Sequence, residues 1–263
     1  MARRTIPGLR AIVTGASSGI GSALARELAL QGAHVLLTAR RDDRLQLVCD
    51  EIKAAGGAAS FVSGDITAAA VRQQLLAAAQ SEWQALDLLV NNAGIGAWGP
   101  FAAADETRLR TVMEVNFFAP LELTRAALPL LAAGRQPLIV NVSSVLGHRA
   151  VPLKSEYCAS KFALHGFSDA LRAELAPRGI DVLLVSPSTT RSEFFQNVLG
   201  DAVPSSQDGW LAMPADAVAR KAVKAIRRGS HEVILSPGGK LLVWLDRLCP
   251  PLADWLVGRY GRR

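Results

Sequence analysis

Cysteine and long apolar runs are scarce in this chain of 263 residues, and each scarcity argues against a class of protein. The three cysteines, Cys49, Cys158 and Cys249, are odd in number and far apart, so neither a disulfide framework nor a CxxC metal or redox site is expected. No run of about 18 uncharged apolar residues occurs, so no transmembrane helix is expected. The N-terminal stretch also lacks the apolar segment of a secretory signal. These features predict a cytoplasmic protein.

Lysine is also rare, because six lysines accompany 23 arginines and the formal net charge is +6. This balance favours an anionic partner, such as a phosphate ligand, a nucleic acid or an acidic membrane surface, or it reflects only a basic surface. No nucleic-acid partner is expected, because no basic stripe with interleaved aromatic residues is present. No metal site is expected either, since the four scattered histidines show no H-x-x-x-H spacing and no carboxylate partner.

The order of apolar segments indicates the fold. Half of the residues are hydrophobic, and short apolar runs alternate with longer segments of helical periodicity. The predicted strands are residues 9–14, 35–38, 59–63, 86–90, 137–142, 180–185 and 232–235. The predicted helices are residues 20–30, 42–54, 68–80, 107–131, 155–176 and 214–227. Apolar strands separated by helices predict an α/β, three-layer, doubly wound Rossmann-type fold with a mostly parallel seven-stranded sheet.

The chain is expected to form one domain over residues 1–238, followed by an apolar and basic extension over residues 239–263. The longest irregular stretch, residues 186–213, is predicted to be a substrate loop, since long loops in compact domains are usually functional. The extension is rich in leucine and tryptophan and is broken by Pro250 and Pro251. Two short amphipathic helices there would lie on a membrane surface, cover the substrate site or form an oligomer contact.

A glycine-rich turn follows the first predicted strand, where residues 14–21 read TGASSGIG. Glycines between a strand and a helix let the backbone approach a pyrophosphate, and the helix N-terminus supplies free N–H groups. This turn is therefore the predicted phosphate site of a dinucleotide, with the candidate residues Gly15, Ser17, Ser18, Gly19, Ile20 and Gly21.

The end of the second predicted strand bears on the choice of cofactor. Ala39 stands where an NAD-selective site usually has an acidic residue, and Arg40 and Arg41 follow it. Arginine accommodates a ribose 2′-phosphate, so NADP(H) is predicted over NAD(H). After the third strand, Asp65 either bonds the adenine amino group or caps the next helix, with Ile66 beside it in the predicted site.

Several motifs together resemble the short-chain dehydrogenase/reductase family. They are TGASSGIG at 14–21, NNAG at 91–94, an asparagine at 116, a serine at 144 and YCASK at 157–161. The resemblance spans roughly residues 8–237. It implies an NAD(P)-dependent oxidoreductase, often a homodimer or homotetramer, that moves hydride between the cofactor and a carbonyl/alcohol pair.

The family's catalytic residues carry over onto Asn116, Ser144, Tyr157 and Lys161. Tyr157 and Lys161 share one face of a predicted helix, and a neighbouring ammonium is expected to lower the pKa of the phenol toward useful acid–base strength. The resemblance also implies that Lys161 contacts the nicotinamide ribose and that Asn116 holds a proton-relaying water. Ser144 would polarise the substrate oxygen.

Further cofactor contacts are expected after the fourth and sixth predicted strands. Contacts are expected from Asn92, Ala93 and Gly94, besides Tyr157 and Lys161, and Asn91 is expected beside the adenosine. The alternative for Asn92 is a purely architectural role, in which its side chain ties adjacent strands together. Pro187 and Thr189 are expected to form part of the cofactor wall. The chain departs from the family pattern there, because Ser188 replaces a glycine and Ser192 replaces a threonine.

The substrate prediction depends on aromatic side chains in predicted loops. Trp98, Phe101, Phe194 and Phe195 flank the expected cleft, and His148 follows Ser144 closely enough to line it. The sequence thus predicts an NADP(H)-dependent reductase or dehydrogenase of a small lipophilic ketone, aldehyde or secondary alcohol, with no metal. The alternative is a catalytically silent NADP(H)-binding sensor or scaffold.

Overall fold

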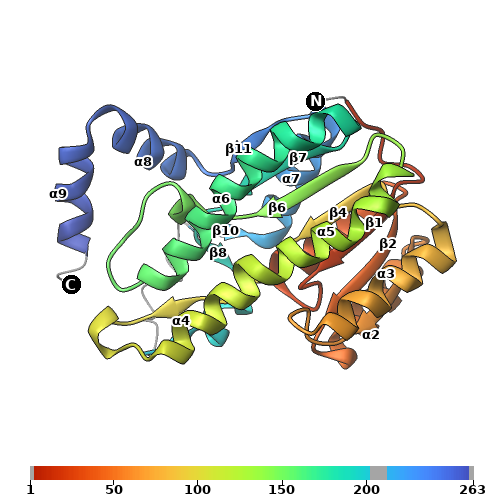
Figure 1. The fold of residues 1–263 in the computed structure, drawn as a ribbon, viewed down its shortest axis with the longest axis horizontal. Helices are drawn as coiled ribbons and strands as arrows, with labels where there is room; N and C mark the ends of the chain where they lie inside the picture. The colour runs from red at the N-terminus through yellow and green to blue at the C-terminus, as the bar shows by residue number, and fades with distance from the viewer. Residues whose placement is uncertain (1–2, 202–211, 261–263) are drawn as a thin grey trace.

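The computed structural model describes residues 3–201 and 212–260 of the chain. Its main sheet has seven strands in the order β11-β7-β6-β4-β1-β2-β3, and every neighbouring pair is parallel (Figure 1). These strands are β1 (Arg10–Thr14), β2 (His34–Ala39), β3 (Ala58–Ser63), β4 (Leu88–Asn91), β6 (Leu138–Val142), β7 (Asp181–Ser186) and β11 (Glu232–Ile234). The predicted doubly wound Rossmann-type fold is therefore confirmed.

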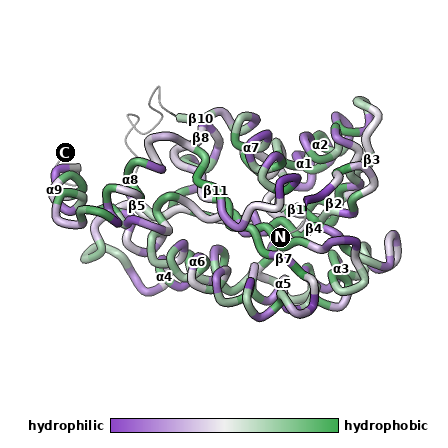
Figure 2. The backbone as a smooth tube through the Cα atoms, turned by 90° about the horizontal axis from the view of Figure 1, so that it is seen from above, coloured by the Kyte–Doolittle hydropathy of each residue, from purple (hydrophilic) through white to green (hydrophobic). Residues whose placement is uncertain are grey.

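Helices cover both faces of the sheet. The described helices are α1 (Gly19–Leu30), α2 (Asp42–Ala54), α3 (Ala69–Trp83), α4 (Glu106–Met113), α5 (Ala119–Ala132), α6 (Ser155–Leu175), α7 (Ala215–Arg228), α8 (Pro237–Leu248) and α9 (Pro250–Tyr260). Figure 2 shows α1, α2 and α7 on one side of the sheet and α3 to α6 on the other. The three layers follow directly from this arrangement.

Apolar side chains alternate between the two faces of each strand. In β1, Val13 packs into the core beneath α1, α2 and α7, whereas Ile12 packs into the core beneath α3, α5 and α6. Leu89 of β4 packs into the same core as Ile12, while Leu88 and Val90 pack into the same core as Val13. Because both faces are buried, the strands have no polar alternation, which is the pattern expected of a covered parallel sheet.

Two regions are more finely divided than the sequence predicts. The predicted helix 107–131 is split into α4 and α5 by a π-helical turn, η2 (Glu114–Phe118). The predicted loop 186–213 contains β8 (Thr190–Arg191), the short 3-10 helix η5 (Glu193–Asn197) and β9 (Leu199–Gly200). β8 pairs with β10 (Met213–Pro214), and β9 pairs with β5 (Ala97–Trp98). The remainder of the loop, residues 202–211, lies outside the described residues.

Three further 3-10 turns complete the described elements: η1 (Phe101–Ala103), η3 (Val145–Gly147) and η4 (Ala176–Arg178). The C-terminal extension forms α8 and α9, which project from one end of the molecule (Figure 1). Among the described helices, none is both long enough and apolar enough to cross a membrane.

Candidate active site

One large pocket, of about 1860 Å³, opens at the carboxyl ends of the strands. From β1 the chain builds the sheet outward through β2 and β3 on one side, and then crosses over to β4 on the other side of β1. Ligands of open α/β sheets bind at such a switch point. The pocket exceeds the roughly 300–1,000 Å³ of ordinary small-molecule sites, so it has room for a dinucleotide and a substrate together. Of the predicted catalytic and cofactor residues, all except Gly21, Asn91 and Asn116 line it.

The glycine-rich turn is closely packed. A Cβ atom on Gly21 would lie 2.2 Å from the main-chain oxygen of Gly15 and 2.5 Å from Nδ2 of Asn92, so only glycine fits. Gly15 and Gly19 have φ values of +64° and +57°, which side chains disfavour. No side chain caps α1 at Ser18, and its first turn carries no acidic residue. The N-terminus of α1 therefore presents main-chain N–H groups and a positive dipole to the pocket.

Arg40 and Arg41 both line the pocket beside this turn. Arg41 donates from Nη2 to Oγ of Ser18 at 2.8 Å and to Oγ of Ser17 at 3.2 Å. Its Nη1 lies 2.7 Å from a carboxylate oxygen of Glu193, which begins η5. This ion pair could not be predicted from the sequence, because 152 positions separate the two residues.

Polar residues after β3 and β4 have different roles from some of those predicted. Asp65 accepts hydrogen bonds from both the main-chain N–H and the hydroxyl of Thr67, so it shapes the turn before α3 rather than occupying that helix's N-cap position. Asn91 does not reach the pocket: it is buried and donates to Thr124 and Asn141, so its predicted contact with adenosine is wrong. Asn92 donates to the carbonyl of Thr14 and ties β4 to β1.

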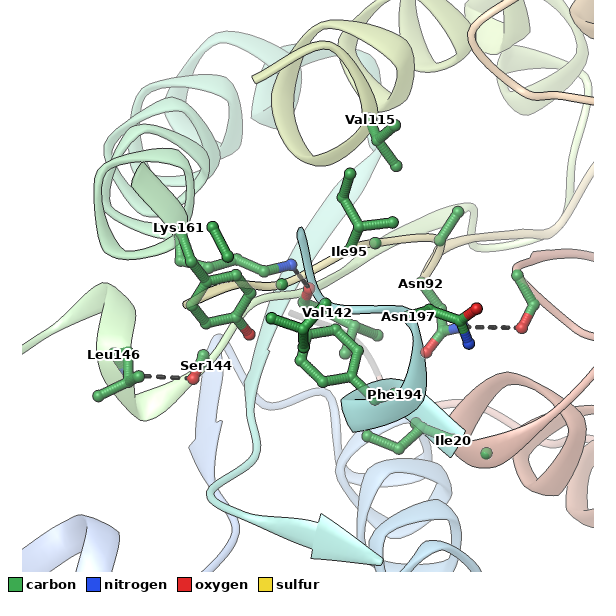
Figure 3. A pocket seen from close by; sticks show the side chains of 18 of the residues that line it. Ile20, Asn92, Ile95, Val115, Val142, Ser144, Leu146, Lys161, Phe194 and Asn197 are labelled. Atoms are coloured by element: carbon green, nitrogen blue, oxygen red, sulfur yellow. Dashed lines mark hydrogen bonds between the residues drawn. The ribbon is translucent and has the colours of Figure 1, made fainter. Parts of the chain in front are cut away.

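Tyr157, Lys161 and Ser144 meet where β6 ends against α6. Figure 3 shows Ser144 and Lys161 pointing into the same cavity, with Phe194 of η5 facing them. Lys161 is buried and donates from Nζ to the carbonyl of Val142 at 3.0 Å. Tyr157 lines the same pocket as Ser144, and its ring lies 5.8 Å from that of Phe194. Three of the four catalytic residues implied by the family resemblance, Ser144, Tyr157 and Lys161, therefore line one pocket in the structure.

Burial governs the ionisation of this group. It raises the pKa of Tyr157 to about 12, against which the hydrogen bond to Ser144 acts only partially. Burial also lowers the pKa of Lys161 to about 8. The predicted lowering of the phenol pKa by Lys161 is thus wrong in this structure: the ammonium lies 5.8 Å from the ring centre and is directed at Val142, and desolvation of the buried phenol dominates its pKa.

Asn116 lies in the π-helical turn, behind the pocket wall. Its Oδ1 accepts from the main-chain N–H of Ile95 at 2.8 Å, and its Nδ2 donates to the carbonyl of Ile95 and to Oγ of Ser160. The side chain thereby fixes the loop after β4 against α6. This loop includes Gly94, where a Cβ atom would lie 3.6 Å from Nζ of Lys161.

A histidine cluster lies apart from the pocket, contrary to two expectations. His148 does not line the pocket; its Nε2 lies 2.9 Å from a carboxylate oxygen of Glu232 and 3.1 Å from Oγ of Ser186. His148, His165 and Glu232 offer ligand atoms within 4.8 Å of one another. The expectation that these histidines have no carboxylate partner is wrong, because the pairing of β11 with β7, and not sequence spacing, brings Glu232 to them.

The substrate side of the pocket is largely apolar. Trp98, Phe194 and Phe195 line it as expected, whereas Phe101 is exposed and does not. Leu242 of α8 and Leu256 of α9 also line it, so the C-terminal extension covers part of the opening.

The comparison with known families decides the classification. The sequence profile of the short chain dehydrogenases matches residues 10–202, most of the chain. The chain belongs to the short-chain dehydrogenase family. It is therefore an oxidoreductase by family, and the predicted resemblance is confirmed.

Other short-chain dehydrogenases match nearly the whole chain. Dehydrogenase/reductase SDR family protein 7-like of Anopheles gambiae is 34% identical, with 99% of this chain and 85% of the relative covered. Ketoacyl reductase HetN of a Nostoc species is 31% identical, with coverages of 98% and 91%. A crystal structure of a Burkholderia phymatum family member in complex with NAD superimposes with a TM-score of 0.85 at 25% identity, covering 95% of this chain and 96% of that one.

The pocket of this short-chain dehydrogenase fits a nicotinamide dinucleotide. The tightly packed glycine turn and the uncapped N-terminus of α1 suit a pyrophosphate, and Tyr157 and Lys161 stand at the other end of the same pocket.

Proposed function

We propose that the protein is an NADP(H)-dependent carbonyl reductase or alcohol dehydrogenase acting on a lipophilic ketone, aldehyde or secondary alcohol. The observation that carries this proposal is the grouping of Ser144, Tyr157 and Lys161 in a pocket that also contains the dinucleotide turn and Arg41. The apolar lining and the relative named as a ketoacyl reductase support the substrate class.

Tyr157 is the proposed general acid and base. When bound, the nicotinamide supplies the hydride for reduction and receives it in oxidation. A phenol with a pKa of about 12 is fully protonated at neutral pH, so it can donate its proton to the carbonyl oxygen as negative charge develops there. Ser144, whose hydroxyl lowers the pKa of Tyr157 against the effect of burial, orients that oxygen. In the reverse direction Tyr157 accepts the alcohol proton only when it is ionised, which a pKa of about 12 confines to alkaline pH.

Lys161 holds a positive charge within reach of this proton transfer. Its ammonium is fixed by the carbonyl of Val142, and Asn116 fixes the neighbouring loop through Ile95. Lys161 thus acts on Tyr157 and the dinucleotide through its charge, and Asn116 acts on them by holding the neighbouring loop in position. A water that relays protons between Asn116 and Lys161 remains part of the proposal.

Arg40 and Arg41 carry the proposed preference for NADP(H), because two guanidinium groups beside the adenosine end suit a 2′-phosphate. Titration of the protein with NADPH and with NADH tests it, and we expect tighter binding of NADPH. Equal binding, or tighter NADH binding, would remove the preference. The substrate class is tested by NADPH oxidation with ketones and aldehydes of graded size; turnover confined to small polar carbonyls would contradict it.

A second proposal concerns α8 and α9, which we assign to peripheral membrane contact. Their exposed apolar side chains are Leu241, Trp244, Leu248, Leu252, Trp255 and Leu256. Asp246 and Asp254 are both paired with Arg149, which offsets one of the two negative charges of these helices. Arg247 and Arg259 lie over Trp244 and Trp255. An apolar surface with basic residues suits an anionic membrane.

Flotation with anionic and neutral vesicles tests the membrane proposal. The protein should float with anionic vesicles, and replacing Trp244 and Trp255 by serine should abolish flotation. Failure of the intact protein to float with anionic vesicles would contradict the proposal. It would also be contradicted if the protein formed a homodimer or homotetramer that the same two substitutions dissociated, because these helices would then form an oligomer contact.

A further inference from the structure

The guanidinium of Arg41 is held by groups from two separate segments. Ser17 and Ser18 of the phosphate turn accept from its Nη2, and Glu193 of η5 accepts from its Nη1 at 2.7 Å. The Arg41 and Glu193 side chains are only 40% and 32% exposed. The ion pair therefore joins the adenosine end of the pocket to the loop that covers its substrate end.

The carboxylate of Glu193 lies in surroundings that suit a phosphate ester. Arg41, together with Ser18 and the nearby charge of Arg44, lowers the pKa of Glu193, so this carboxylate is ionised at neutral pH. Guanidinium and hydroxyl groups bind carboxylates and phosphates through the same charge-assisted hydrogen bonds. A ribose 2′-phosphate at Arg41 and the carboxylate of Glu193 would thus use the same donors.

We propose that Glu193 is an internal competitor for the 2′-phosphate of NADP(H) and thereby a determinant of cofactor specificity. This inference rests on the proposed function, in which Arg41 receives that phosphate. NADPH binding exchanges one oxyanion on Arg41 for another, whereas NADH carries a hydroxyl at this position and leaves the ion pair intact. Glu193 therefore weakens NADPH binding selectively.

The exchange also reaches the catalytic group. Phe194 follows Glu193 directly, and its ring contacts that of Tyr157 edge-on, with centroids 5.8 Å apart. Ser192 precedes Glu193, and its side chain lies against Gly19, where it would be 3.0 Å from an added Cβ atom. Release of Glu193 from Arg41 frees η5 at one of its attachments, so η5 is less restrained in the NADPH complex than in the NADH complex.

The variant Glu193→Gln keeps the size of the side chain and removes its charge. Its Kd for NADPH should fall by roughly two- to fivefold, the upper part of the range expected for a partly exposed ion pair, while its Kd for NADH changes by less than about twofold. The matched control is Glu122→Gln, which removes a carboxylate paired with Arg125 on the exposed surface of α5 and should change neither Kd. An unchanged or raised Kd for NADPH in Glu193→Gln would overturn the inference, as would equal tightening of both cofactors.

Arg41→Gln separates this inference from the proposed function. It should raise the Kd for NADPH and leave that for NADH unaltered. If Arg41→Gln changes neither Kd, the NADP(H) proposal fails; if it behaves as expected while Glu193→Gln does not, only the role of Glu193 fails.

Hydrogen–deuterium exchange of residues 192–198 supplies a readout that is independent of activity. The wild-type protein should exchange faster there with NADPH bound than with NADH bound, and Glu193→Gln should remove the difference. Equal exchange in the two wild-type complexes would show that η5 is not released.

Discussion

The ammonium of Lys161 donates to the main-chain carbonyl of Val142 at 3.0 Å, which fixes a buried cation to the last residue of β6. Ser144 lies two residues further along, and Tyr157 lies one helical turn before Lys161. This contact places the cation beside the acid–base group. It also places the cation where burial disfavours charge.

The burial of Lys161 predicts a specific dependence of stability on pH. With a pKa of about 8 in the folded protein and 10.5 when unperturbed, the unfolded state binds more protons between these values. The free energy of unfolding of the cofactor-free protein should therefore gain a favourable contribution from Lys161 as pH rises from 8 to 10.5, on the order of 3 kcal/mol.

The variant Lys161→Met lacks this titration, so its stability relative to the wild type should fall steadily across the same interval. Urea unfolding at several pH values measures the difference. Lys224→Met, an exposed substitution on α7, should show no such trend. If the difference in unfolding free energy between the wild type and Lys161→Met did not depend on pH, the lowered pKa of Lys161 would be contradicted.

The close packing of Gly21 predicts that Gly21→Ala damages both stability and cofactor binding. The added methyl group meets the carbonyl of Gly15, which belongs to the phosphate turn and cannot move freely. We expect a loss of about 1–3 kcal/mol of unfolding free energy and at least roughly tenfold weaker NADPH binding.

Gly166→Ala is the matched control for Gly21→Ala. Gly166 lies in α6, and an added Cβ atom meets nothing within 4 Å, so alanine should stabilise the protein by about 0.5–1 kcal/mol without affecting binding. Thermal unfolding and NADPH titration measure both variants. Normal binding by Gly21→Ala would refute the assignment of the turn to a pyrophosphate.

A buried ion pair fixes the first turn of α6, next to Tyr157. Glu156 accepts from Nε of Arg108 at 2.9 Å and from its Nη2 at 2.6 Å, and both side chains are almost fully buried. Glu156→Ala leaves the guanidinium unpaired and should cost about 3–5 kcal/mol of unfolding free energy. Glu122→Ala, on the exposed surface, should cost less than about 1 kcal/mol.

The same pair predicts an acid sensitivity. Burial alone disfavours the carboxylate of Glu156, but hydrogen bonds from its own main-chain N–H, Arg108 and Ser155 lower its pKa below 4.5. Its stabilising contribution is therefore complete above pH 4.5 and lost as pH falls through the lower folded pKa. Acid unfolding of Glu156→Gln should lack this component, and an unchanged acid profile would contradict the lowered pKa.

The sequence predicted the sheet and the pocket well because both depend on local signals. Apolar runs indicate buried strands, and glycines define the turn at 14–21. The structure shows why glycine is required there, because a Cβ atom on Gly21 would clash with the main chain of Gly15. Tyr157 and Lys161 are four residues apart, which suffices to place them on one helix face.

The sequence could not predict contacts between distant segments. Glu193 meets Arg41, and Glu232 meets His148, only because the loop after β7 and the pairing of β11 with β7 bring them together. The ionisation of Tyr157 was likewise wrongly predicted, since desolvation depends on the side chains that enclose it. Asn91 and Asn92 are adjacent in the chain, yet strand alternation turns one into the core and the other toward β1.

Tyr157→Phe tests the central claim that this pocket transfers a proton during carbonyl reduction. The variant keeps the aromatic ring against Phe194 and loses only the phenolic hydroxyl, so it should fold normally and bind NADPH with a Kd within about twofold of the wild-type value. Its turnover of a carbonyl substrate that the wild-type protein accepts should fall by at least roughly 10²-fold. Turnover equal to that of the wild type would contradict the proposed mechanism and remove Tyr157 from it.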